Sequence, residues 1–457
     1  MNSFLVNFCE SLFDLTFKKS FHPNRMLDTS DAYQSALTSS LTTTDEGKDQ
    51  DVHKYMSFPV ALLNLLNLLI GAEILGVANS FTFCGLTVSL SLMVFTAMLS
   101  YIGTIIILNL QKRVAAESIN DLATKIVGRW GGQLFSGITL FFTYSNQVSY
   151  LFIGAETICS WLTLGGLEEW TTGWRRSLVV LCYALILPVA LSIPKQMEFI
   201  DTASMAAILV QLLFVSSMIY KAVDFFVIQD RPVDPSAETG TIGITFFNAF
   251  AIYSTLYALP AVVLPQLQPF TPNMKSRYIL LGCAFIGCFT IDIVPSIIGY
   301  LMFGAGTEQI VLSSFDHSDI LMQVVRSGFF FVVNASFPLV ALSILTDLGA
   351  IIFNEHNPRQ LSWKRRIILL CLADSVPVLI AMILPAVRPI FEIGGAFGGC
   401  LSNFFFPPLL YFLQSGKRWF HPKSLALLTF SIFGLLSCGI CTYQAVLDAI
   451  DAFKGEN

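Results

Sequence analysis

The feature that most constrains the fold of this chain is a series of long apolar segments that recurs from residue 58 almost to the end. These segments are long enough to cross a hydrocarbon layer about 30 Å thick as α-helices. Within that layer the backbone N–H and C=O groups must bond to one another, and an α-helix achieves this along its whole length. The sequence therefore predicts an all-α integral membrane protein with about eleven transmembrane helices. The expected ranges are 58–81, 85–110, 134–162, 177–193, 199–220, 244–264, 279–303, 320–345, 366–385, 389–413 and 424–447.

The composition agrees with a membrane protein and argues against an enzyme. Of the 457 residues, 54% are hydrophobic and 12% are charged, about half of the roughly 25% that is typical of soluble domains. All five histidines lie outside the apolar segments, and no H-E-x-x-H or D-H-H-C string occurs. We therefore expect no catalytic site and no cofactor. The lack of a basic stripe speaks against a nucleic-acid partner.

Polar and apolar regions divide the chain into three parts. Residues 1–57 are rich in Ser and Thr, and we expect them to form a disordered cytosolic tail. Residues 58–447 form the predicted transmembrane domain, and residues 448–457 a short C-terminal tail. A cytosolic N-terminus places most of the 26 Lys and Arg residues on the cytosolic side, as the positive-inside rule requires. An odd number of spans then puts the C-terminus on the opposite side.

The loop at 111–133, on the predicted cytosolic side, has apolar residues at helical spacing. Ile119, Leu122, Ala123 and Ile126 fall on one side of such a helix. This spacing predicts a short amphipathic helix on the cytosolic surface.

Charged side chains inside the apolar segments are costly in lipid, and they mark function or structural ion pairs. We expect Asp292 and Asp374 at mid-depth. Arg326 lies in the outer part of its helix and needs a partner, which the sequence alone cannot choose. Glu156 and Glu392 fall near the predicted outer ends, where we expect them to reach water.

The most informative segment is NLLNLLIGAEILGVANSF, in the first predicted helix. Gly71 and Gly76 lie on either side of Glu73, and glycines allow a helix to open. An opened backbone is tolerable in a membrane only where it lines a cavity. The half-helix that follows would offer N–H donors and its positive dipole end to a carboxylate. We therefore expect a substrate site at Gly71, Ala72, Glu73, Ile74 and Gly76; close packing between helices is the alternative for the glycines.

A second interruption is expected in the segment 244–264. Ser254 and Thr255 lie at mid-depth there, and Pro260 and Pro265 follow. Pro260 removes a backbone donor and disturbs the preceding turn. Interrupted helices at corresponding places in two halves are typical of inverted-repeat transporters, which bind substrate at mid-depth. We expect Ser254 and Thr255 to bind substrate, with a simple proline kink as the alternative.

Four short motifs occur in a fixed order along the chain. They are N-x-x-x-G-x-x-I-L-G from Asn67 to Gly76, GYLMFG at 299–304, VVRSGFFFVVNASFPLV at 324–340, and PAVRPIFEIGGAFGGCLSNFFFPPLLYFL at 385–413. With them, the chain from about 57 to 447 resembles the amino acid/auxin permease family, which includes sodium-coupled neutral and proton-coupled amino acid transporters. The resemblance implies a leucine-transporter-like fold of five-plus-five inverted repeats with one extra helix, and amino acid transport by alternating access.

The resemblance also implies an ion site. In sodium-coupled members an Asn of helix 1 and a Thr of helix 8 contribute to it, and these positions match Asn67 and Ser336, the residue two before Pro338. Both side chains offer oxygen ligands suited to a small cation. We expect a Na⁺ site at Asn67 and Ser336 and no other metal site; ordinary hydrogen bonding between helices is the alternative.

Two positions depart from the family pattern. Glu73 stands where the family has the second glycine of a G-S-G triplet, and the usual Cys-His-Pro of helix 6 is absent from FAIYSTLYALP. Glu73 could carry a coupling proton, select a cationic substrate or neutralise a nearby cation. Because a bare anion would repel a substrate carboxylate, we favour a protonated Glu73 when a neutral amino acid is bound.

These features predict secondary active transport of amino acids, coupled to Na⁺ or H⁺. A nutrient-sensing transporter homologue with little flux and an ion channel are the alternatives, and the paired interruptions favour a carrier over a channel. The expected partners are an amino acid substrate and the lipid bilayer. The expected location is the plasma membrane or an organelle similar to a lysosome or vacuole.

Overall fold

The computed structural model describes most of the chain from residue 55 onward. The described residues are 55–116, 118–194, 200–353, 361–384, 386–416, 418 and 420–455. The predicted N-terminal tail lies outside them, apart from residues 55–57. All regular structure in the described part of the chain is helical.

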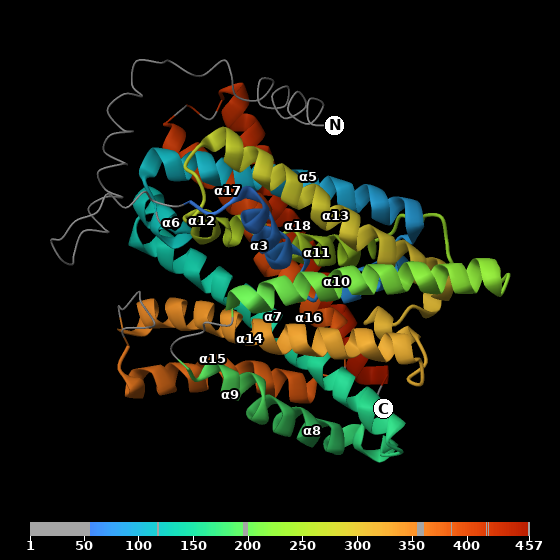
Figure 1. The fold of residues 1–457 in the computed structure, drawn as a ribbon. Helices are drawn as coiled ribbons and strands as arrows, with labels where there is room; N and C mark the ends of the chain where they lie inside the picture. The colour runs from blue at the N-terminus through green and yellow to red at the C-terminus, as the bar shows by residue number, and fades with distance from the viewer. Residues whose placement is uncertain are drawn as a thin grey trace.

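Eight of the described helices are long and apolar enough to cross a membrane, or nine if one bent pair counts as a single span. This confirms the predicted all-α multi-pass membrane class (Figure 1). The helices at these spans are α3 (Phe58–Ile70), α4 (Ile74–Ser80), α5 (Gly85–Val114), α8 (Gly173–Ile186), α9 (Pro188–Ser192), α10 (Ile200–Ala222), α13 (Met274–Phe303), α14 (Ile320–Phe353), α15 (Trp363–Ile383), α16 (Arg388–Ile393), η9 (Gly394–Phe405), α17 (Phe406–Ser415) and α18 (Pro422–Gly455).

The two other expected spans hold helices that are not among these eight or nine. The range 134–162 lies within α7 (Arg129–Leu164), and the range 244–264 holds α11 (Phe246–Leu256), η6 (Leu259–Ala261) and most of α12 (Val263–Leu267). At 36 residues α7 is long enough to span, and it crosses the bundle obliquely between its neighbours (Figure 1). Helical structure therefore occurs at every expected position, while the count of eleven spans stays a prediction.

Short helices connect the long ones. They are η3 (Phe81–Phe83), α6 (Ile119–Val127), η4 (Glu168–Trp170), η5 (Val223–Ile228), η7 (Gly304–Gly306) and η8 (Val311–Ser314). The predicted amphipathic helix is confirmed as α6, since Ile119, Leu122 and Ala123 are buried. Its polar side is also engaged, because the Asn120 side chain donates a hydrogen bond to Asp347 of α14 at 3.1 Å.

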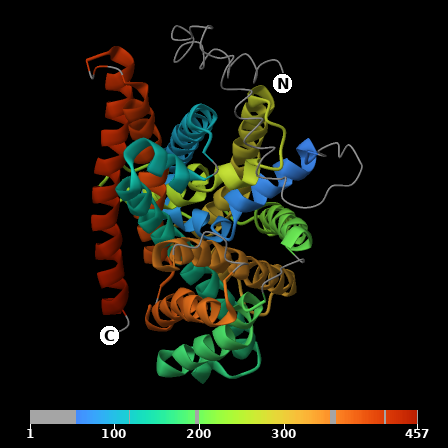
Figure 2. The ribbon, with the colours of Figure 1, turned by 90° about the vertical axis from the view of Figure 1, so that its left-hand side faces the viewer.

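The last helix is longer than the apolar segment that predicts it. The segment ends at 447, whereas α18 continues to Gly455 and takes in most of the expected C-terminal tail. Figure 2 shows α18 along one edge of the bundle, where it packs against η9, α16 and α17.

Candidate functional site

The first span opens where the glycines predict it. α3 ends at Ile70, α4 begins at Ile74, and their axes differ by 49°. Gly71 has φ +49°, and a Cβ atom on it would lie 2.1 Å from Oε2 of Glu73. The Glu73 carboxyl group therefore lies over Gly71, in space that only a glycine leaves free. We call the segment Gly71–Glu73 the break.

The Glu73 carboxyl group occupies the backbone N–H donors that we expected to bind the carboxylate of a substrate. The backbone N–H groups of Ala72 and Glu73 face this carboxyl group. Ala72, Glu73 and Ile74 are all buried.

Gly76 lies in a different environment, because a Cβ atom there would come within 3.0 Å of the Phe391 ring. Gly76 thus lies at a close contact between helices.

Gln211 of α10 is a site residue that the sequence analysis missed. Its side-chain Nε2 donates a hydrogen bond to the carbonyl oxygen of Gly71 at 3.1 Å, and the residue is fully buried. The signal that could have found it is a polar amide in the middle of the otherwise apolar range 199–220.

Asp292 of α13 lies beside the break. α13 packs against both halves of the broken span: Gly287 faces Leu66 of α3, and Gly299 faces Ala78 of α4. Asp292 lies between these two contacts along α13 and interacts electrostatically with Glu73. It is fully buried, and its Oδ2 accepts a hydrogen bond from the Cys288 thiol at 3.0 Å. The sequence predicts that Asp292 lies at mid-depth, and the structure shows that Glu73 is near it.

The second predicted interruption is present, but its polar residues bond elsewhere. α11 ends at Leu256, ahead of Pro260. The Ser254 hydroxyl donates to the carbonyl of Phe250 at 2.7 Å, and the Thr255 hydroxyl donates to the carbonyl of Phe391 of α16 at 2.9 Å. These hydroxyl groups serve α11 and its contact with α16, whereas the neighbouring Tyr253 hydroxyl accepts a hydrogen bond from Ser80 of α4 at 2.8 Å.

The two residues of the expected Na⁺ site are both half-buried. Among the described residues, no hydrogen bond links the Asn67 and Ser336 side chains to each other or to any other group. The Asn67 carbonyl accepts a backbone bond from Gly71 at 3.2 Å, directly before the break. The Na⁺ site at Asn67 and Ser336 thus stays a prediction.

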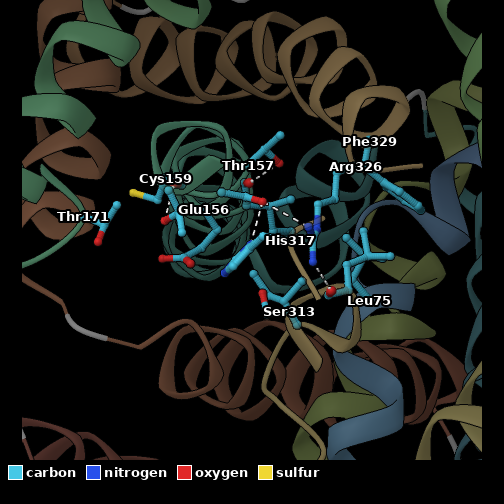
Figure 3. A pocket seen from close by; sticks show the side chains of 14 residues that line it. Leu75, Glu156, Thr157, Cys159, Thr171, Ser313, His317, Arg326 and Phe329 are labelled. Atoms are coloured by element: carbon cyan, nitrogen blue, oxygen red, sulfur yellow. Dashed lines mark hydrogen bonds between the residues drawn. The ribbon is translucent and has the colours of Figure 1, made fainter. Parts of the chain in front are cut away.

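A cavity of about 190 Å³ adjoins the break on the predicted outer side (Figure 3). Leu75 of α4, Glu156 and Ser160 of α7, Arg326 of α14 and the loop residue His317 contribute to its lining. His317 Nδ1 and the Ser160 hydroxyl lie 2.8 Å apart. Glu156 forms an ion pair with Arg176 at 3.1 Å and lines this cavity, so it lies where it can meet water.

The hydrogen-bond partners of Arg326 are neutral, although Asp316 and Asp319 interact with it electrostatically. Its guanidinium donates to the carbonyls of Leu312 and Phe315 at 2.6 and 2.9 Å, and to the Ser160 hydroxyl at 3.0 Å. Next to it, the backbone N–H and hydroxyl of Ser318 lower the pKa of the exposed Asp316 carboxyl group. Arg326 thus fastens the loop before α14 to α7.

Two further acids lie away from the break. The expectation that Glu392 reaches water is wrong: it is fully buried and accepts a hydrogen bond from Asn248 of α11 at 3.2 Å. The ion pair of Arg388 with Asp448 of α18, at 2.9 Å, lies beside it. Asp374 accepts from Gln147 of α7 at 3.2 Å. Within the described residues, no group of three or more His, Cys, Asp or Glu side chains could hold a metal ion.

Comparison with known proteins yields matches over most of the chain. Residues 54–447 match the family model described as transmembrane amino acid transporter protein. The amino acid transporter AVT6E of Arabidopsis thaliana is 21% identical over 380 residues, which cover 78% of this chain and 76% of that protein. The sodium-coupled neutral amino acid symporter 2 of Danio rerio is 22% identical over 386 residues, which cover 78% and 75%.

Proposed function

Because the chain belongs to the transmembrane amino acid transporter family, we propose that it moves amino acids across a membrane by alternating access, with Na⁺ or H⁺ as the coupling ion. The substrate binds at the break through Gly71, Ala72, Glu73 and Ile74. We propose the plasma membrane or an organelle similar to a lysosome or vacuole as its location.

The break between α3 and α4 is the observation that carries this proposal. An opened backbone at membrane depth is stable only inside protein or beside a cavity, and here its residues are buried among α10 and α13. Half-helix ends at mid-depth suit a substrate with one anionic and one cationic group. The interruption after α11 gives the second broken element that a carrier of this type uses, and a channel needs neither.

Two observations bear on the coupling ion. One relative is named a sodium-coupled symporter, and Asn67 and Ser336 could supply oxygen ligands to Na⁺. Glu73, buried at the break, could instead carry a proton. The experiment below therefore tests a Na⁺ gradient and an H⁺ gradient separately.

The test is uptake by the full chain reconstituted in liposomes. A panel of labelled amino acids is offered under an imposed Na⁺ gradient, an imposed H⁺ gradient or no gradient, with protein-free liposomes as the control. We expect saturable uptake above equilibrium with one of the two gradients. Unsaturable ion conductance would indicate a channel, and binding without flux a sensor; either result would overturn the proposal.

A further inference from the structure

Three buried polar side chains lie at or beside the break, and they offer more hydrogen-bond acceptors than donors. Glu73 is 7% exposed, and Gln211 and Asp292 are fully buried. Among the described residues, no ion pair joins either carboxyl group to a Lys or Arg side chain. Burial of a charge is costly unless the charge is paired, so these two acids are either protonated or paired with a cation.

The hydrogen bond of Gln211 leaves an unused oxygen atom next to the break. The Gly71 carbonyl can only accept, so the end of the Gln211 amide that faces it must be Nε2. The Oε1 atom of the same planar amide is buried and has no partner within the described residues. An unpartnered acceptor of this kind points to a missing donor or cation.

Asp292 presents a second unused oxygen atom. Its Oδ2 is bonded to Cys288, while its Oδ1 is buried and has no partner in the described part of the chain. The contacts of Gly287 with Leu66 and of Gly299 with Ala78 show that α13 runs alongside the broken span in the same direction. Asp292 is five residues after Gly287, and Gly71 is five residues after Leu66, so this carboxyl group lies level with the break.

Protonation of Glu73 alone does not satisfy these acceptors. A protonated carboxyl group supplies one O–H donor, whereas two buried oxygen atoms, on Gln211 and Asp292, lack a partner. An ammonium group supplies three donors, and an alkali cation is held by several oxygen atoms at once. A cation therefore fits the group of side chains better than a single proton.

We propose that Glu73, Gln211 and Asp292 form a binding site for one positive charge, held by their side-chain oxygen atoms. The charge comes either from the side chain of a basic amino acid substrate or from Na⁺. This site is separate from the expected pair Asn67 and Ser336. The inference rests on the proposed function, because the bound positive charge would belong either to the transported amino acid or to an ion that is transported with it.

The test measures binding to the full chain in lipid nanodiscs. Labelled arginine is compared with citrulline, its uncharged analogue, in Na⁺ medium and in medium where choline replaces Na⁺. Asp292→Asn removes the charge and keeps the shape. Asp374→Asn is the matched control, because Asp374 is another buried acid but bonds to Gln147, away from the break.

The two sources of charge give different results. If the substrate carries it, arginine binds without Na⁺, citrulline binds at least tenfold more weakly, and Asp292→Asn weakens arginine binding at least tenfold. If Na⁺ carries it, citrulline binds only with Na⁺, and Asp292→Asn raises the half-saturating Na⁺ concentration at least tenfold. Asp374→Asn should behave as the unmutated protein in both cases. Gln211→Leu, which removes the second oxygen atom, repeats the measurement if Asp292→Asn does not fold.

Two outcomes would overturn the inference in distinguishable ways. Citrulline binding that equals arginine binding, needs no Na⁺ and is unchanged by Asp292→Asn would exclude the cation site while leaving amino acid transport intact. A failure to bind or transport any amino acid of the panel would reject the proposed function itself.

Discussion

At the scale of single residues, Glu73 and Gly71 determine the character of the break. The glycine gives the chain a backbone conformation and an open space that a Cβ atom would remove, and the carboxyl group fills that space. The sequence predicts both residues because glycines and an acid in an apolar span are conspicuous. It does not predict that Gln211 bonds to the Gly71 carbonyl or that Glu73 and Asp292 interact electrostatically, because these interactions depend on which helices pack together.

Replacement of Glu73 by Gln should remove the pH dependence of uptake, because glutamine mimics the protonated carboxyl group and cannot titrate. Binding of a neutral amino acid should be preserved, whereas binding of a cation at Glu73, Gln211 and Asp292 should weaken, because one ligand loses its charge. The titratable groups that face Glu73 are Tyr150 of α7 and Cys288 and Asp292 of α13. The measurement is uptake over a pH series, with Glu156→Gln of α7 as the control. A variant that transports normally with an unchanged pH profile would show that Glu73 is structural.

The change Gly71→Ala should reduce uptake at least tenfold. The backbone conformation of Gly71 is one that other residues adopt at a cost of order 1–3 kcal/mol, and the new methyl group would displace the Glu73 carboxyl group. Gly439→Ala is the control, because nothing lies within 4 Å of a Cβ atom at that position of α18. Equal uptake by the two variants would mean that the break is not needed for transport.

If Ser336 helps to ligate Na⁺, Ser336→Ala should raise the Na⁺ concentration required for uptake severalfold, because one oxygen ligand is lost. The measurement is uptake as a function of Na⁺, with Ser343→Ala of the same helix as the control. Uptake by the unmutated protein that is indifferent to Na⁺ would contradict this role and favour proton coupling.

At the scale of helices, three buried arginines fasten the preceding or neighbouring loop to the beginning of a long helix. Arg277 of α13 donates to the carbonyls of Leu267 and Phe270, and Arg366 of α15 donates to those of Ser192 and Pro194. Arg326 does the same for the loop before α14. The sequence shows that these charges need partners, and backbone carbonyls are partners that no sequence pattern reveals.

The role of Arg326 leads to a prediction about the cavity that adjoins the break. Arg326→Met would remove three hydrogen bonds and leave the carbonyl of Phe315 without a donor, at a cost of about 1–3 kcal/mol. We expect a melting temperature lower by several degrees and faster protease cleavage in the loop between α13 and α14. Arg326→Lys should restore little of this, because an ammonium on a flexible stem cannot reproduce the planar fork of donors. Arg365→Met, at an exposed position of α15, is the control. Full rescue by lysine would mean that charge alone matters.

At the scale of the whole molecule, apolar length predicts where the helices lie but not which of them form the interior. Helix α7 carries buried polar residues such as Ser145, Gln147 and Ser149, because it packs against several other helices, among them α14, α15 and η9. Hydropathy is therefore a poor guide for α7, although Tyr150 of this helix interacts electrostatically with Glu73. In the same way, Glu392 is buried because α16 packs against α11 and α18, and Asp448 of α18 lies beside it.

The predicted topology has its own test. Tags at the two ends of the chain should differ in protease accessibility in sealed vesicles, because an odd number of spans separates the termini. Accessibility of both tags from the same side would mean that one span is miscounted. The short pair α8 and α9, interrupted at Pro188, is the first place to examine.

The position of the Glu73 carboxyl group over Gly71 means that the protein holds an acid group of its own at the N–H donors of the break. Such a tethered group competes with an incoming carboxylate, and the measured affinity falls by the fraction of time for which the donors are free. A cation that draws the Glu73 carboxyl group toward Asp292 would release the N–H groups of Ala72 and Glu73. Cation and carboxylate would then each strengthen the binding of the other by the same factor, so an acid in place of a glycine could itself link the two binding events.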